Sequence, residues 1–86
     1  MLKKIKVTPA MQHMTGNREY VEVKGDTVRE CINDLIRQYP GFKDWFDVNA
    51  PVAWVVVNED RWNLKDMDRV LTEKDELGLV LVVGGG

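Results

Sequence analysis

The stretch GDTVRECINDLIRQYPGF, residues 25–42, decides the fold of this 86-residue chain because it marks both ends of one helix. Thr27 stands three residues before Glu30, the capping-box spacing in which each side chain accepts a hydrogen bond from the other residue's free backbone N–H. Pro40 and Gly41 end the helix after roughly a dozen residues, an average helix length. We therefore expect one amphipathic helix packed across a sheet. Its apolar stripe at helical spacing comprises Val28, Ile32, Leu35, Ile36 and Tyr39.

Two alternating segments precede this helix and predict a hairpin. In residues 2–8, apolar side chains alternate with lysines from position 4 onward, whereas positions 2 and 3 break the pattern. Residues 18–24 place Val21 and Val23 on one face. The segment 9–17 between them contains proline, glycine and asparagine, which predicts a loop longer than a two-residue turn.

The second half of the chain predicts the middle of the sheet. Residues 53–57 and 77–83 are continuously apolar, as central strands are. Residues 61–63 are expected to form a short edge strand, and residues 72–76 a polar turn. The last strand can lie parallel to the first because the intervening chain is long enough for a crossover. The expected fold is α+β, a mixed sheet with one main helix in the β-grasp (ubiquitin-like) arrangement.

Composition limits the classes of function. With 44% hydrophobic and 30% charged residues, the chain is expected to form a soluble globular domain rather than a disordered one. We expect residues 1–86 to form a single domain with a flexible glycine tail at 84–86. A net charge of −2 does not favour nucleic-acid binding, and a mildly acidic surface fits a protein partner with a basic face.

The compartment is inferred from cysteine and apolar runs. Cys31 is the single cysteine, so no disulfide can form within the chain and a reducing compartment is favoured. No segment has the apolar run of a signal peptide or of a membrane span. The sequence therefore predicts a cytoplasmic protein that does not act at a membrane.

The unusual feature is the run of glycines at 84–86, directly after an apolar strand. Such a tail should project from the sheet and be mobile. Without Cβ atoms it can lie extended in a channel too narrow for other residues. Its carboxylate becomes reactive when ATP converts it to an acyl-adenylate, which a sulfur or nitrogen nucleophile then attacks. A frayed end without function is the alternative interpretation.

The order of several motifs resembles the MoaD/ThiS family of sulfur-carrier proteins, which are relatives of ubiquitin. The matching segments are residues 25–42, VVVN at 55–58, DEL at 75–77 and the closing Gly85 and Gly86. The resemblance covers nearly the whole chain. Residues 79–84 depart from it, because the molybdopterin branch is expected to carry an aromatic pair at the positions of Leu79 and Val80. The length and the long 9–17 loop nevertheless favour a molybdopterin-type carrier over a thiazole-type one.

The resemblance implies a carrier that acts as a cosubstrate or subunit and is not itself an enzyme. An E1-like adenylyltransferase would activate Gly86, and Gly85 would let the tail enter its active site. A persulfide donor would then produce a thiocarboxylate, whose sulfur passes to an accepting enzyme such as the large subunit of a molybdopterin synthase. No cofactor is expected on the chain, and ATP is used by the partner.

Two other functions remain open from the sequence. A ubiquitin-like modifier would transfer the same activated tail to a lysine of a target protein, and a plain β-grasp interaction module would not use the tail. For partner contact we expect exposed apolar residues near the last strand, with Trp62 and Leu79 as candidates. Cys31 is expected to be a buried hydrophobe and His13 a solvated loop residue, so no metal site is predicted.

Overall fold

The computed structural model describes residues 1–46, 53–58, 60–62 and 67–81, with the backbone alone for residues 53, 54, 60–62 and 81. In chain order the elements are β1 (Leu2–Val7), the 3-10 helix η1 (Pro9–Thr15), β2 (Tyr20–Lys24), α1 (Val28–Gln38), the 3-10 helix η2 (Pro40–Phe46), β3 (Ala53–Val57), β4 (Asp60–Trp62) and β5 (Leu77–Leu81).

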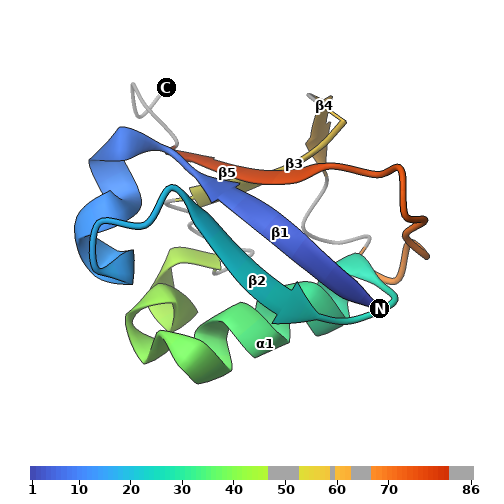
Figure 1. The fold of residues 1–86 in the computed structure, drawn as a ribbon, viewed down its shortest axis with the longest axis horizontal. Coiled ribbons are helices and arrows are strands. Elements are labelled where there is room, and N and C mark those ends of the chain that lie inside the picture. Colours follow the sequence, from blue (N-terminus) through green and yellow to red (C-terminus); the bar gives the residue numbers. More distant parts are fainter. Residues whose placement is uncertain (47–52, 59, 63–66, 82–86) are drawn as a thin grey trace.

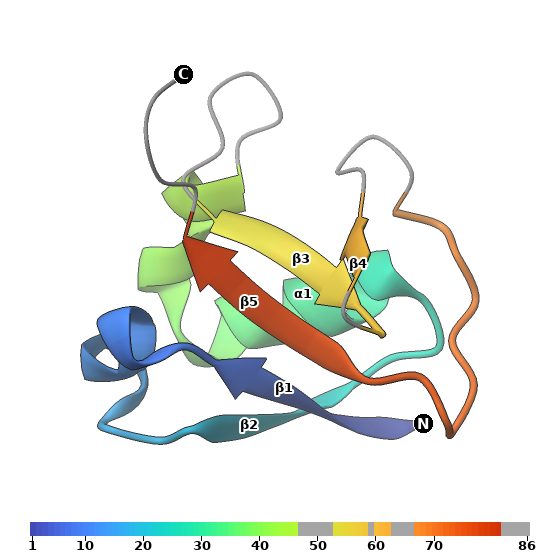
Figure 2. The same ribbon diagram turned by 90° about the horizontal axis from the view of Figure 1, so that it is seen from above.

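Within these residues, five strands form one sheet in the order β2-β1-β5-β3-β4. β1 and β5 are parallel, and the other neighbouring strands are antiparallel. The helix α1 crosses one face of the sheet, and no described helix covers the other face, which we call the open face (Figures 1 and 2). The expected mixed β-grasp sheet with one main helix is confirmed, as is the parallel pairing of the first and last strands.

The capping box at the start of α1 is formed as the sequence predicts. Thr27 Oγ1 accepts from the Glu30 backbone N–H at 3.1 Å, and Glu30 Oε1 accepts from the Thr27 backbone N–H at 3.1 Å. The predicted apolar stripe faces the sheet, with Val28, Ile32 and Leu35 buried, and Ile36 and Tyr39 packed against the core from its edge.

Two smaller predictions have different outcomes. Cys31 is fully buried beside the stripe, and burial raises the pKa of its thiol, as fits a small core hydrophobe. The segment 9–17 is more ordered than a loop, because most of it forms η1. Met11 and Thr15 are buried there, and the Thr15 hydroxyl donates to the backbone carbonyls of Gln12 and Arg18.

The connection between β2 and α1 passes unusually close to the first turn of the helix at Gly25. A Cβ placed at Gly25 would lie 2.7 Å from the backbone nitrogen of Cys31 and 2.7 Å from Cβ of Glu30. Both obstacles belong to the helix itself and cannot rotate away. This position therefore requires glycine for packing.

We expect Gly25→Ala to lower the free energy of unfolding by about 1–3 kcal/mol, the usual cost of overpacking. Gly78→Ala is the matched control, because a Cβ at Gly78 would meet only ordinary contacts of 3.7 Å and longer. Denaturant titration of both variants measures the difference. Equal stability of the two variants would contradict the packing argument.

Candidate functional site

The strand that leads toward the glycine tail is the central strand of the sheet. β5 pairs in parallel with β1, where Leu79 lies opposite Val7, and in antiparallel with β3, where Ala53 lies opposite Leu81. A central strand is held by backbone hydrogen bonds on both sides. The end of β5 at Leu81 is therefore a fixed point of the fold.

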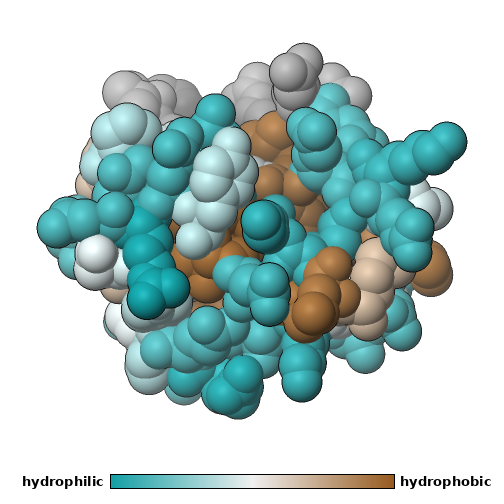
Figure 3. Space-filling model, in the orientation of Figure 1, coloured by the Kyte–Doolittle hydropathy of each residue, from teal (hydrophilic) through white to brown (hydrophobic). Residues whose placement is uncertain are grey.

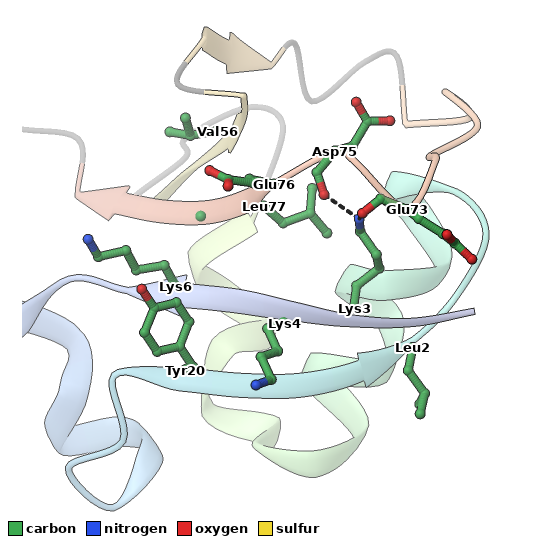
Figure 4. A pocket seen from close by; sticks show the side chains of 11 residues that line it. Leu2, Lys3, Lys4, Lys6, Tyr20, Val56, Glu73, Asp75, Glu76 and Leu77 are labelled. Carbon is green, nitrogen blue, oxygen red and sulfur yellow. Dashed lines mark hydrogen bonds between the residues drawn. The ribbon is translucent and has the colours of Figure 1, made fainter.

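The beginning of β5 is held by an unexpected residue, Lys3. Its side chain lies on the buried face of β1 and is 7% exposed. Its ammonium donates to the backbone carbonyls of Thr72 at 2.8 Å, Glu73 at 3.4 Å and Asp75 (Figure 4). Burying an ammonium is costly unless its protons are hydrogen-bonded, and here three carbonyls accept them. Through these hydrogen bonds, Lys3 connects the turn before β5 to β1.

Asp75 organises the same turn through its side chain. Its carboxylate accepts from the backbone N–H of Thr72 at 2.8 Å and from the amide of Asn58 at 2.7 Å, with Arg69 at 3.5 Å. Asn58, in the left-handed region at φ 53°, also exchanges hydrogen bonds with the backbone of Glu76. The turn is thereby joined to the end of β3 as well as to β1.

These hydrogen bonds favour the charged form of Asp75. The backbone N–H of Thr72, followed by the side chain of Asn58, lowers the pKa of Asp75 to about 2. In the unfolded chain the pKa of the Asp75 carboxyl should be about 3.9. The carboxylate therefore stabilises the fold above pH about 4, and this contribution is lost as the pH falls toward about 2.

Replacing this carboxylate should reduce the loss of folding stability at acid pH. We expect Asp75→Asn to be less stable than the wild type at neutral pH, and to lose less stability between pH about 5 and about 2. Glu73→Gln, an exposed carboxylate in the same turn, is the control and should keep the wild-type slope. The measurement is the denaturant midpoint of the wild type and of both variants across this pH range. An identical slope for Asp75→Asn and the wild type would show that Asp75 is not the titrating group.

The predicted site residues have three different outcomes. Gly85 and Gly86 lie outside the described residues. Trp62 lies in β4 at the edge of the sheet, as expected for that segment, but its side chain is outside the description. The prediction of Leu79 as an exposed contact residue is wrong, because Leu79 is 1% exposed and belongs to the core. It shares its face of β5 with Leu77, and both side chains point toward the helix layer.

Other chemical sites are limited in the described part of the chain. His13 is exposed, as expected. No group of three or more His, Cys, Asp or Glu residues among the described residues is arranged to hold a metal ion. None of the helices described has the length and apolar character needed to span a bilayer.

Sequence reasoning missed Lys3 and Asn58 as the residues that hold the turn. Lys3 stands at a position whose alternation points inward, together with Ile5 and Val7, and this was the available signal. Its acceptors are backbone carbonyls about 70 residues away, as in the Lys3 to Thr72 bond with a separation of 69, and side-chain patterns do not reveal such partners.

The fold and the tail-bearing central strand define a small ubiquitin-like protein with the architecture of sulfur carriers. The chain matches the ThiS family over residues 5–86, and it therefore belongs to that family. No curated protein sequence matches the chain.

Solved structures show the same fold at low identity. The BexX/CysO complex of Amycolatopsis orientalis contains a chain that is 24% identical, with 96% of this chain and 98% of that chain covered and a TM-score of 0.77. Small archaeal modifier protein 1 of Methanosarcina acetivorans is 20% identical, with coverage of 99% and 96% and a TM-score of 0.77. The complex of subunits 1 and 2 of molybdopterin-converting factor from Helicobacter pylori gives 17% identity, full coverage of both chains and a TM-score of 0.67. Two of these three relatives were solved in complexes with protein partners.

Proposed function

We propose that this chain is a sulfur carrier that is loaded at the carboxylate of Gly86. The observation that carries the proposal is the ThiS-family match, which extends to residue 86 and includes the glycines that follow β5. The ubiquitin-like fold supports it, because a rigid domain with a narrow tail can present that tail to two different enzymes in turn. The chain itself is a cosubstrate or small subunit and does not catalyse the reaction.

The proposed chemistry has two activation steps. A carboxylate oxygen of Gly86 attacks the α-phosphorus of ATP on an E1-like adenylyltransferase, which forms the acyl-adenylate and releases pyrophosphate. A persulfide sulfur then attacks the acyl carbon and displaces AMP, and reductive cleavage of the sulfur–sulfur bond by a thiol leaves the thiocarboxylate. ATP would be bound by the partner. We propose the cytoplasm as the compartment of the reaction, because the single Cys31 favours a reducing environment.

For the sulfur-accepting enzyme we favour a molybdopterin-synthase-like large subunit. The supporting observation is that the chain and its match in the molybdopterin-converting factor complex of Helicobacter pylori cover each other completely. The aromatic pair expected in that branch is absent, because the aliphatic residues Leu79 and Val80 stand at these positions. Leu79 lies in the core, and Val80 is half-buried on the opposite side of β5.

A ubiquitin-like modifier is the second candidate. It is favoured by the likeness to a small archaeal modifier protein, whose chain is covered almost completely. A modifier would leave Gly86 joined by an isopeptide bond to lysines of other proteins, which peptide mapping of a cell extract detects. A plain interaction module, the third possibility, would keep its function after deletion of Gly85 and Gly86.

The tail itself provides the test of the proposal. Gly85→Ala adds a Cβ and restricts the backbone inside the narrow channel. One extra residue after Gly86 moves the carboxylate by up to about 3.5 Å, when misplacement of about 1 Å can already cost on the order of 100-fold in rate. Both changes should abolish or strongly reduce ATP-dependent adenylation by the cognate enzyme, measured as pyrophosphate release.

The control separates loss of chemistry from loss of fold. Both variants should keep the wild-type melting temperature, because the core residues lie before the tail. Gly41→Ala, an exposed glycine whose added Cβ would meet only the flexible end of Met14, should be adenylated normally. Normal adenylation of the extended protein or of Gly85→Ala would refute the proposed role of the tail.

A further inference from the structure

The face of the sheet opposite α1 carries a hollow of about 500 Å³. Four residues form a row across it, one from each of four neighbouring strands. Tyr20 of β2 lies opposite Lys6 of β1, Lys6 lies opposite Gly78 of β5, and Gly78 lies opposite Val56 of β3. Figure 3 shows hydrophobic residues exposed in the middle of this face with hydrophilic residues around them.

Gly78 creates the depth of this hollow. It stands between Lys6 and Val56 and contributes no side chain, so the backbone of β5 forms the floor. A Cβ here would lie 3.7 Å from the Lys6 carbonyl oxygen and 3.9 Å from Cβ of Val56, both ordinary contacts. The packing of the fold therefore does not require glycine at this position, and its effect is on the shape of the open face.

The hollow is electrically polarised. Lys4 and Lys6 are exposed on β1, and within the residues that the structure describes neither ammonium makes a hydrogen bond or an ion pair. Glu22 is the cross-strand neighbour of Lys4, whereas Lys6 faces the uncharged Tyr20. Three carboxylates line the hollow where β5 begins, those of Glu73, Asp75 and Glu76 (Figure 4). The Asp75 carboxylate already accepts hydrogen bonds from Thr72 and Asn58. An anion is therefore favoured over Lys6 and disfavoured near the carboxylates at the beginning of β5.

We propose that this hollow docks a segment of a protein partner that presents a carboxylate to Lys6 and an apolar side chain to the floor formed by Gly78 and Val56. The net charge of −2 suggests a partner with a basic face, but the end of the hollow at Lys6 favours the opposite sign. Only the identity of the partner, as the activating or the sulfur-accepting protein, rests on the proposed function. The contact itself follows from the unpaired ammonium, the ring of Tyr20 and the open floor.

The test uses two blocked peptides, acetyl-Leu-Glu-Leu-Glu-Leu-amide and its glutamine analogue, titrated into the ¹⁵N-labelled protein at millimolar concentrations. The glutamate peptide should shift the amide signals of Lys6, Tyr20 and Gly78, and the glutamine peptide should bind about tenfold more weakly or not at all. Because neither peptide involves Gly86, the result does not depend on whether the tail is adenylated. Absence of binding by the glutamate peptide, or equal binding of the two, would overturn the proposal.

Variants locate the contact within the hollow. Lys6→Glu should weaken binding of the glutamate peptide by about tenfold, as expected when attraction becomes repulsion, and by more than Lys4→Glu. Gly78→Val should block the floor while the melting temperature is kept, and Glu76→Gln should leave binding equal or tighter. Lys43→Glu in η2 is the matched charge control and should bind as the wild type does. Equal weakening by Lys43→Glu and Lys6→Glu would show a nonspecific charge effect and overturn the docking site.

Discussion

The position of β5 in the middle of the sheet is the constraint on which the rest of the structure depends. Its parallel pairing with β1 joins the two ends of the chain, so the entropic cost of closing that long loop must be offset by the core and by local contacts. The buried Lys3 ammonium and the Asn58 amide supply such contacts where β5 begins. Because these contacts fix the start and the direction of β5, they also fix the position of Leu81 at its end.

The sheet leaves few places for a partner to bind. At the outer edge of β2, the Lys24 backbone N–H donates to Asp34 at 3.0 Å, and the Glu22 carbonyl accepts from Gln38 at 2.8 Å. These helix side chains occupy backbone groups that could otherwise pair with another strand. One face of the sheet is covered by α1. Among the described residues, the open face of the sheet remains as a surface that a partner can reach.

The helix and the order of strands could be predicted from the sequence because their signals are local. The capping box of Thr27 and Glu30 needs only a spacing of three, and the buried stripe needs only the helical period. The parallel pairing of β1 with β5 followed from chain length and from the apolar character of residues 77–83.

The wrong or missing predictions have two causes. Either the hydrophobic pattern does not show which side chains point inward, or the hydrogen-bond partner is distant in the sequence. A continuously apolar strand does not show which side chains point inward. The sequence therefore predicts an exposed Leu79, although this residue is part of the core. Lys3 was assigned to a break in the alternation because lysine is usually solvated. Its carbonyl acceptors in the turn at 72–75 become visible only when β1 and β5 are side by side. The roles of Gly85, Gly86 and Trp62 stay predictions.

The most direct test of the central claim is the intact mass of this protein isolated from its native cell, followed by fragmentation of its C-terminal peptide. A sulfur carrier should show a species in which one sulfur replaces one oxygen, with the change located at Gly86. A protein found only with an unmodified carboxylate, in cells that have the activating enzyme and a sulfur source, would contradict the account.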